Sequence, residues 1–230
     1  MSVPLTTHLA SLSTPRPYAA ATQHAFLTAA GTGTLPHPLL SLYLSQDRIY
    51  AAHGYPRFIG QLLTRIPYSS THALDSPEEQ LHSDVVKLLA FALQNVHREV
   101  GMFGEVERKY ALNFGQWRER KATRDYTAEM ARVGAFGTLE DGLVFLWAME
   151  RVSVLVCECC ADLGCSLEHV IAQVYLDAWK YAKSLLVNVS DRSDGDSTLP
   201  AVRQLVENWT CPEFEQFVDD IADLVNRCVD

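Results

Sequence analysis

The sequence lacks three features that would place the protein at a membrane or on nucleic acid. Its apolar runs are all far shorter than the ~20 residues that a transmembrane helix needs. Residues 1–20 hold no basic segment followed by an apolar one, so no secretory signal is expected. Basic residues are the minority, with 19 Lys and Arg against 28 Asp and Glu and a net charge of -9. These absences argue against membrane and nucleic-acid partners and favour a cytoplasmic protein.

Strand signals and phosphate-binding loops are also missing. No segment alternates apolar and polar residues, and no glycine-rich phosphate loop is present. Apolar residues instead recur at helical spacing, which predicts an all-α, single-domain bundle over residues 1–230. The expected helices cover residues 17–30, 38–66 with a bend near Gly54, 76–96, 103–111 and 123–133, followed by one that begins at Thr138 and a last one that begins at Pro212.

Six cysteines are present, but their spacing is not that of a disulfide or metal framework. Four of them crowd into residues 157–165, whereas Cys211 and Cys228 lie far away. This spacing matches no familiar zinc motif, and only His169 is nearby as a further ligand. Free thiols are therefore expected.

Asp47 lies inside the apolar stripe of an expected helix. Tyr43 and Leu44 precede it by one turn, and Tyr50 follows by one turn. A carboxylate removed from water costs several kcal/mol unless it is paired, and no Lys or Arg shares the stripe. A ligand is one candidate partner. The alternative is a structural aspartate satisfied by a tyrosine hydroxyl or a backbone donor.

Glu150 repeats this pattern on a second helix. Leu143, Leu146 and Trp147 precede it by seven, four and three residues, so it also lies on an apolar face. Burial would raise the pKa of the Glu150 carboxyl, which suits a general acid or base near neutral pH. Two inward acids near aromatic rings therefore predict a polar patch in the bundle interior.

A di-metal oxidase is an alternative function for acids inside a bundle. Such a site needs several carboxylates and a histidine at Glu-x-x-His spacing on facing helices. Asp47 and Glu150 have no histidine three or four residues further on. Glu79 and His82 fit the spacing, but they lie at a helix start that is expected to be exposed. Neither a metal nor a cofactor is predicted.

Two segments resemble the TenA / thiaminase II family. They are residues 44–60, LSQDRIYAAHGYPRFIG, and residues 208–218, NWTCPEFEQFV. The closer likeness is to the fungal and plant-like branch that has a glutamate in place of a catalytic cysteine. The resemblance covers roughly residues 5–228 and implies a haem-oxygenase-like helical fold without haem. It also implies hydrolysis of a C–N bond in aminopyrimidines related to the thiamin pyrimidine, in thiamin salvage.

The resemblance further implies roles for particular residues. Asp47 is similar to the aspartate that binds the amino group and a ring nitrogen of the pyrimidine. Glu150 stands in the segment where other members have the cysteine, which implies that it is the acid or base. Tyr50, Tyr126 and Tyr175 are similar to tyrosines of the substrate pocket. The implied partner is a small aminopyrimidine, and the implied assembly is a homo-oligomer.

The chain departs from the family pattern at two places. Residues 152–173 interrupt a helix that is continuous in this branch, and they would displace Tyr175 from the turn after Glu150. The segment begins with valine, whose codons start with GT, and ends with glutamine, whose CAG codon ends in AG. We hypothesise an unspliced intron translated in frame; a lineage-specific loop is the alternative. Family members also continue into a final helix with a catalytic glutamate, and this helix is expected to be missing after residue 230. Glu215 is not expected to replace it, because it belongs to the earlier helix and should lie on a solvated face.

These departures leave two functions open besides the oxidase. The first is an aminopyrimidine hydrolase in which Asp47 and Glu150 are catalytic. The second is a catalytically impaired protein that binds a heterocycle on the same fold.

Overall fold

The computed structural model describes residues 3–13, 17–151, 154–155, 171–173, 175–189 and 197–229. The helices in these ranges are α1 (Leu5–Ala10), α2 (Ala19–Thr22), α3 (Ala25–Gly31), α4 (His37–Ile49), the π-helical turn η1 (Tyr50–Gly54), α5 (Tyr55–Leu63), α6 (Pro77–Lys109), the 3₁₀ turn η2 (Phe114–Gln116), α7 (Lys121–Phe136), α8 (Leu139–Arg151), α9 (Leu176–Leu186), α10 (Leu199–Trp209) and α11 (Pro212–Val229). A short antiparallel pair, β1 (Val154–Leu155) and β2 (Ile171–Gln173), lies between α8 and α9 in the chain.

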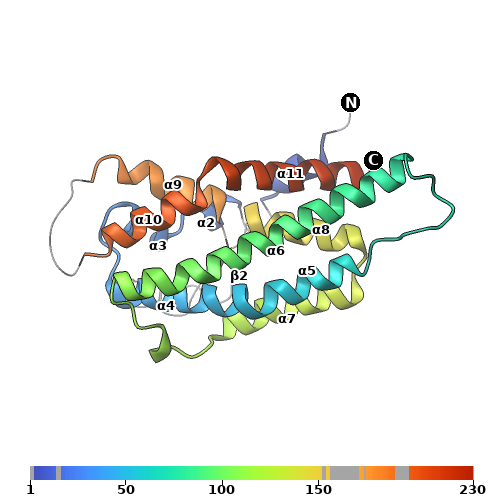
Figure 1. The fold of residues 1–230 in the computed structure, drawn as a ribbon. Coiled ribbons are helices and arrows are strands. Elements are labelled where there is room, and N and C mark those ends of the chain that lie inside the picture. The colour runs from blue at the N-terminus through green and yellow to red at the C-terminus, as the bar shows by residue number, and fades with distance from the viewer. Residues whose placement is uncertain are drawn as a thin grey trace.

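The predicted all-α bundle is confirmed. Figure 1 shows α6 crossing the whole bundle, with α4, α5 and α7 on one side and α9, α10 and α11 on the other. Helix α11 packs on α8 and α6, α5 packs on α6 and α7, and α3 packs on α9. Long helices with one apolar face bury that face most completely when they pack side by side around a common core. Among the described residues, no helix combines the length and apolarity needed to cross a bilayer.

The expected bend near Gly54 is confirmed as the π-helical turn η1 between α4 and α5. The backbone N–H of Tyr55 donates to the carbonyl of Tyr50, five residues earlier. Pro56, which has no N–H to donate, lies in the first turn of α5 directly after this π-helical turn. Since five residues make roughly one turn of a π-helix, Tyr50 and Tyr55 face the same side. Both rings are consequently buried in the core.

Two helix boundaries differ from the expectation. The segment 17–30 is not one helix but two, because the ring of His24 caps α3 by accepting from the Phe26 N–H at 3.2 Å. Helix α6 does not end near Val96 but runs on through Gly101 and Gly104 to Lys109. Glycine lowers helix propensity by about 1 kcal/mol, but the buried side chains beyond the glycines keep the helix on the core.

Four other sequence expectations can be compared with the structure. The Thr138 hydroxyl accepts from the Asp141 N–H at 3.1 Å, which confirms the predicted start of α8. His82, expected at an exposed helix start, is buried with 5% exposure. Cys211 and Cys228 are free thiols, whereas the other four cysteines lie outside the described residues. The inward face predicted for the last helix is buried, as seen for Phe214, Phe217, Val218, Ile221, Leu224 and Val225.

The contact between α3 and α9 depends on a glycine. A methyl group on Gly31 would lie 2.6 Å from the carbonyl oxygen of Ala182 and 2.7 Å from Cβ of Leu185. We predict that Gly31→Ala lowers the free energy of unfolding by about 1–3 kcal/mol, because the backbone of α9 cannot yield. Gly60→Ala on α5 is the matched control, since nothing lies within 4 Å of its added methyl. In urea denaturation, Gly60→Ala should leave the free energy of unfolding unchanged or raise it by up to ~1 kcal/mol. An equal loss of unfolding free energy in Gly31→Ala and Gly60→Ala would contradict the prediction.

Candidate active site

A chain of hydroxyl groups connects three of the predicted site residues. The Tyr50 hydroxyl donates to the Tyr175 hydroxyl at 2.7 Å, and the Tyr175 hydroxyl donates to Oδ1 of Asp47 at 3.1 Å. Asp47 comes from α4, Tyr50 from η1 and Tyr175 from the residue before α9, so three elements meet here. Each side chain is at most 3% exposed. The tyrosine donor that was one alternative for Asp47 is therefore present.

Burial sets the protonation of Asp47. It raises the pKa of the Asp47 carboxyl well above its usual value, and the negative charge of Glu99 raises it further. Hydrogen bonds from Tyr175 and Tyr43 favour the ionised form and act in the opposite direction on this pKa. The Asp47 carboxyl therefore keeps its proton to a higher pH than an exposed aspartate does.

Glu150 lies near the C-terminal end of α8. Its carboxyl accepts a hydrogen bond from the Tyr55 hydroxyl at 2.5 Å, and the residue is 6% exposed. Burial raises the pKa of Glu150 to about 8, with a smaller contribution from the charge of Glu99 and an opposing one from the Tyr55 hydrogen bond. At neutral pH this carboxyl is mainly protonated, as a general acid must be.

Glu99 on α6 is a site residue that the sequence analysis missed. Its Oε1 accepts a hydrogen bond from the indole N–H of Trp209, and burial raises the pKa of Glu99 to about 7. The hydrogen bond from Trp209 and the charge of Arg98 act in the opposite direction. Val96 and Phe103 are buried three residues before and four residues after Glu99. The spacing argument that identified Asp47 and Glu150 would thus have found it, had the expected helix not ended at Val96.

A small cavity lies among these groups. Its volume is about 10 Å³, enough for roughly one water molecule. A cavity that admits a benzene-sized ring is about 150 Å³. The cavity is therefore too small for an aromatic ring in this structure. The lining residues are Tyr50, Tyr55, Asn95, Val96, Glu99, Glu150, Tyr175 and Phe214.

Tyr126 on α7 lies one layer behind the cavity. Its ring meets the ring of Tyr50 edge-on, with the centroids 5.5 Å apart and an interplanar angle of 70°. The residue is 4% exposed. The structure thus brings together Asp47, Tyr50, Tyr175 and Glu150 around one interior region, while Tyr126 supports the Tyr50 ring.

Tyr175, which the insertion at residues 152–173 was expected to displace, contacts Asp47 in this structure. Helix α8 ends at Arg151, and Val154 pairs with Gln173, so the two ends of the segment lie together. The Arg151 guanidinium lies 3.5 Å from the carboxylate of Asp177 at the start of α9. Apart from β1 and β2, the segment lies outside the described residues, and the intron remains a hypothesis.

Two solved structures that share this fold carry TenA names. A TenA homologue from Pyrococcus furiosus aligns with a TM-score of 0.64 and 16% identity, over 92% of this chain and 79% of that one. A TenA family transcription regulator from Silicibacter sp. TM1040 aligns with a TM-score of 0.66 and 16% identity, over 97% of this chain and 79% of that one. The protein therefore has the helical fold of TenA homologues, as the sequence resemblance implied.

Sequence comparison adds one curated relative. No family model matches the chain. A "Probable transcription factor" of Fusarium pseudograminearum (strain CS3096) is 26% identical over 218 residues, which cover 90% of this chain and 42% of that protein. The chain thus spans about two fifths of the length of the curated relative it matches.

The raised carboxyl pKa values make stability depend on pH. Glu150 titrates near its ordinary pKa of 4.5 when unfolded and at about 8 when folded, so the folded state binds more protons in between. Stability should fall as pH rises through this window, by up to roughly 1.4 kcal/mol for each pKa unit. We predict that, as pH rises from 5 to 9, the free energy of unfolding falls less for Glu150→Gln than for the original chain.

Urea titrations at a series of pH values measure this difference. Glu105→Gln is the matched control, because Glu105 is exposed on α6. It should follow the original chain at every pH. If Glu150→Gln shows the same pH dependence as the original chain, the raised pKa of Glu150 is wrong.

Proposed function

We propose that the protein hydrolyses the C–N bond of a small aminopyrimidine. The observation that carries this proposal is a set of three carboxyl groups with raised pKa values, Asp47, Glu99 and Glu150, around a tyrosine-lined interior. Carboxyl groups that titrate near neutral pH can exchange protons with a substrate under physiological conditions. The TenA fold and the resemblance to the glutamate branch support the same chemistry.

Asp47 is the proposed binding residue for the heterocycle. An aminopyrimidine presents an amino N–H donor next to a ring nitrogen acceptor. A protonated carboxyl matches this edge, because its O–H donates to the ring nitrogen and its carbonyl oxygen accepts from the amino group. The raised pKa of Asp47 keeps this proton available. Since the cavity holds only about 10 Å³, Tyr175 must move from the Asp47 carboxyl when the ring binds.

Glu150 and Glu99 are the proposed acid and base. Glu150, with a pKa of about 8, donates its proton to the leaving amine as the bond between carbon and nitrogen breaks. A water molecule adds its oxygen to that carbon and gives a proton to Glu99, whose pKa is about 7. The products are the hydroxymethylpyrimidine and ammonia. Both carboxyl groups line the water-sized cavity, which supports their action on one water molecule.

A protein that binds the heterocycle without turnover is the second candidate. It is favoured by the closed interior, in which the Tyr175 hydroxyl, itself an acceptor from Tyr50, already donates to the Asp47 carboxyl. A role as a transcription factor, which the name of the fungal relative gives to that protein, finds less support here, because the net charge of this chain is -9.

Hydrolysis of aminomethylpyrimidine tests the first candidate. Because one carboxyl must be ionised and the other protonated, kcat/KM should pass through a maximum between pH 7 and pH 8, between the pKa values of about 7 and about 8. Glu99→Gln and Glu150→Gln should each lower kcat by about 10²–10⁴-fold. Ammonia release measures the rate, and Glu105→Gln should retain full activity. No turnover at any pH by the original chain would reject the enzyme.

Ligand binding tests the role of Asp47 in both candidate functions, the hydrolase and the heterocycle-binding protein. Calorimetry with aminomethylpyrimidine should show at least ~100-fold weaker binding by Asp47→Leu, which removes both polar contacts while it keeps the core apolar. Asp47→Asn retains a donor and an acceptor, so its affinity should lie within about tenfold of the original. Equal binding by Asp47→Leu and the original chain would place the ligand elsewhere.

A further inference from the structure

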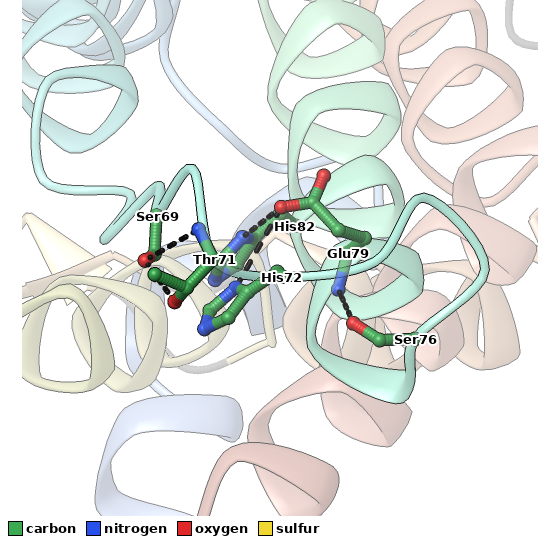
Figure 2. A network of polar contacts seen from close by, with 6 residues as sticks. All are labelled: Ser69, Thr71, His72, Ser76, Glu79 and His82. Atoms are coloured by element: carbon green, nitrogen blue, oxygen red, sulfur yellow. Dashed lines mark hydrogen bonds and ion pairs between the residues drawn. The ribbon is translucent and has the colours of Figure 1, made fainter.

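A second polar cluster lies at the opposite end of α6 from Glu99. Glu79 and His82 are on the first two turns of α6, three residues apart and therefore on one side of the helix. The loop between α5 and α6 brings His72 to the same place. There the backbone N–H of His72 donates to the backbone carbonyl of Ser69 at 3.2 Å. Figure 2 shows the two imidazoles and the carboxylate facing one another.

The distances suit a shared cation. Nδ1 of His72 lies 3.6 Å from Oε1 of Glu79, and Nδ1 of His82 lies 4.0 Å from the same oxygen. One ligand atom from each residue lies within 4.8 Å of the others. Around a tetrahedral zinc ion with bonds near 2.1 Å, neighbouring ligand atoms are about 3.4 Å apart. Small side-chain rotations would therefore complete the coordination.

Burial makes the cluster incomplete without a further partner. His82 is 5% exposed, and Nδ1 of His72 and Nδ1 of His82 are buried with no hydrogen-bond partner among the described residues. A buried polar atom without a partner costs about 1–3 kcal/mol. The Tyr68 ring meets the His82 ring edge-on at 5.4 Å, which fixes its orientation. Two such imidazole nitrogens beside one carboxylate are the arrangement that a divalent cation satisfies.

We propose that His72, Glu79 and His82 bind one Zn²⁺ ion. Two imidazoles and one carboxylate are a nitrogen and oxygen set that zinc prefers, and a water molecule completes four-coordination because His72 and Glu79 are only partly buried. Since α6 rises ~1.5 Å per residue, Glu79 and Glu99 are roughly 30 Å apart. The ion therefore takes no part in chemistry at Glu99; it joins the loop between α5 and α6 to the first turns of α6.

Metal titration of the full chain tests the proposal. Metal-free protein should bind one Zn²⁺ at this site in competition with a chromophoric chelator. His72→Ala and Glu79→Gln should each weaken that binding by at least ~10–100-fold, since both side chains are partly exposed and their loss leaves the core intact. His97→Ala is the matched control, because His97 is an exposed histidine on the same helix. It should bind like the original chain.

Cobalt distinguishes this site from the cysteines at 157–165. Co²⁺ bound by imidazole and carboxylate gives visible bands without the intense near-ultraviolet band that thiolate ligands add. The difference between the Co²⁺ spectra of the original chain and His72→Ala should contain visible bands but no thiolate band in the near ultraviolet. Zn²⁺ should also raise the melting temperature of the original chain but not that of His72→Ala. Zinc binding unchanged by both variants, or a cobalt spectrum due only to thiolates, would overturn the proposal.

Discussion

The burial of carboxyl groups inside a helical bundle is the constraint on which the site depends. Asp47, Glu99 and Glu150 are close enough for the charge of Glu99 to raise the pKa of the other two. Ionising all three together would concentrate negative charge at low dielectric, so protons are retained near neutral pH. Hydroxyl and indole donors from Tyr175, Tyr55 and Trp209 stabilise the ionised forms. Protonated and ionised carboxyls thus coexist in a narrow pH range.

Irregular backbone positions two of the site tyrosines, whereas the three carboxyls lie on regular α-helices. The π-helical turn η1 allows Tyr50 and Tyr55 to share a side, so one reaches Tyr175 and the other reaches Glu150. Tyr175 itself lies just before α9, at the point where β2 returns the chain to the bundle. A regular helix through residues 37–63 would turn one of the two tyrosines away from the interior.

Helix α6 connects the two polar sites of the molecule. In its second half Glu99 lines the small cavity together with the site tyrosines. At its start Glu79 and His82 face His72 (Figure 2). The two sites differ in what completes them. At the carboxyl site each of the three acids accepts a hydrogen bond from a tyrosine or tryptophan side chain. The histidine cluster leaves buried imidazole nitrogens without a partner among the described residues, and for that reason we assign it a metal.

The sequence by itself determined the all-α class, the bend at Gly54, the start of α8 and the inward faces that carry Asp47 and Glu150, because helical periodicity and capping are local properties. It did not determine that α6 continues past Val96, since packing of later residues on the core outweighs the cost of two glycines. Only the tertiary structure decided that Glu99 joins the two acids and that Tyr175 reaches Asp47. Those contacts join residues far apart in the chain, and no local pattern encodes them.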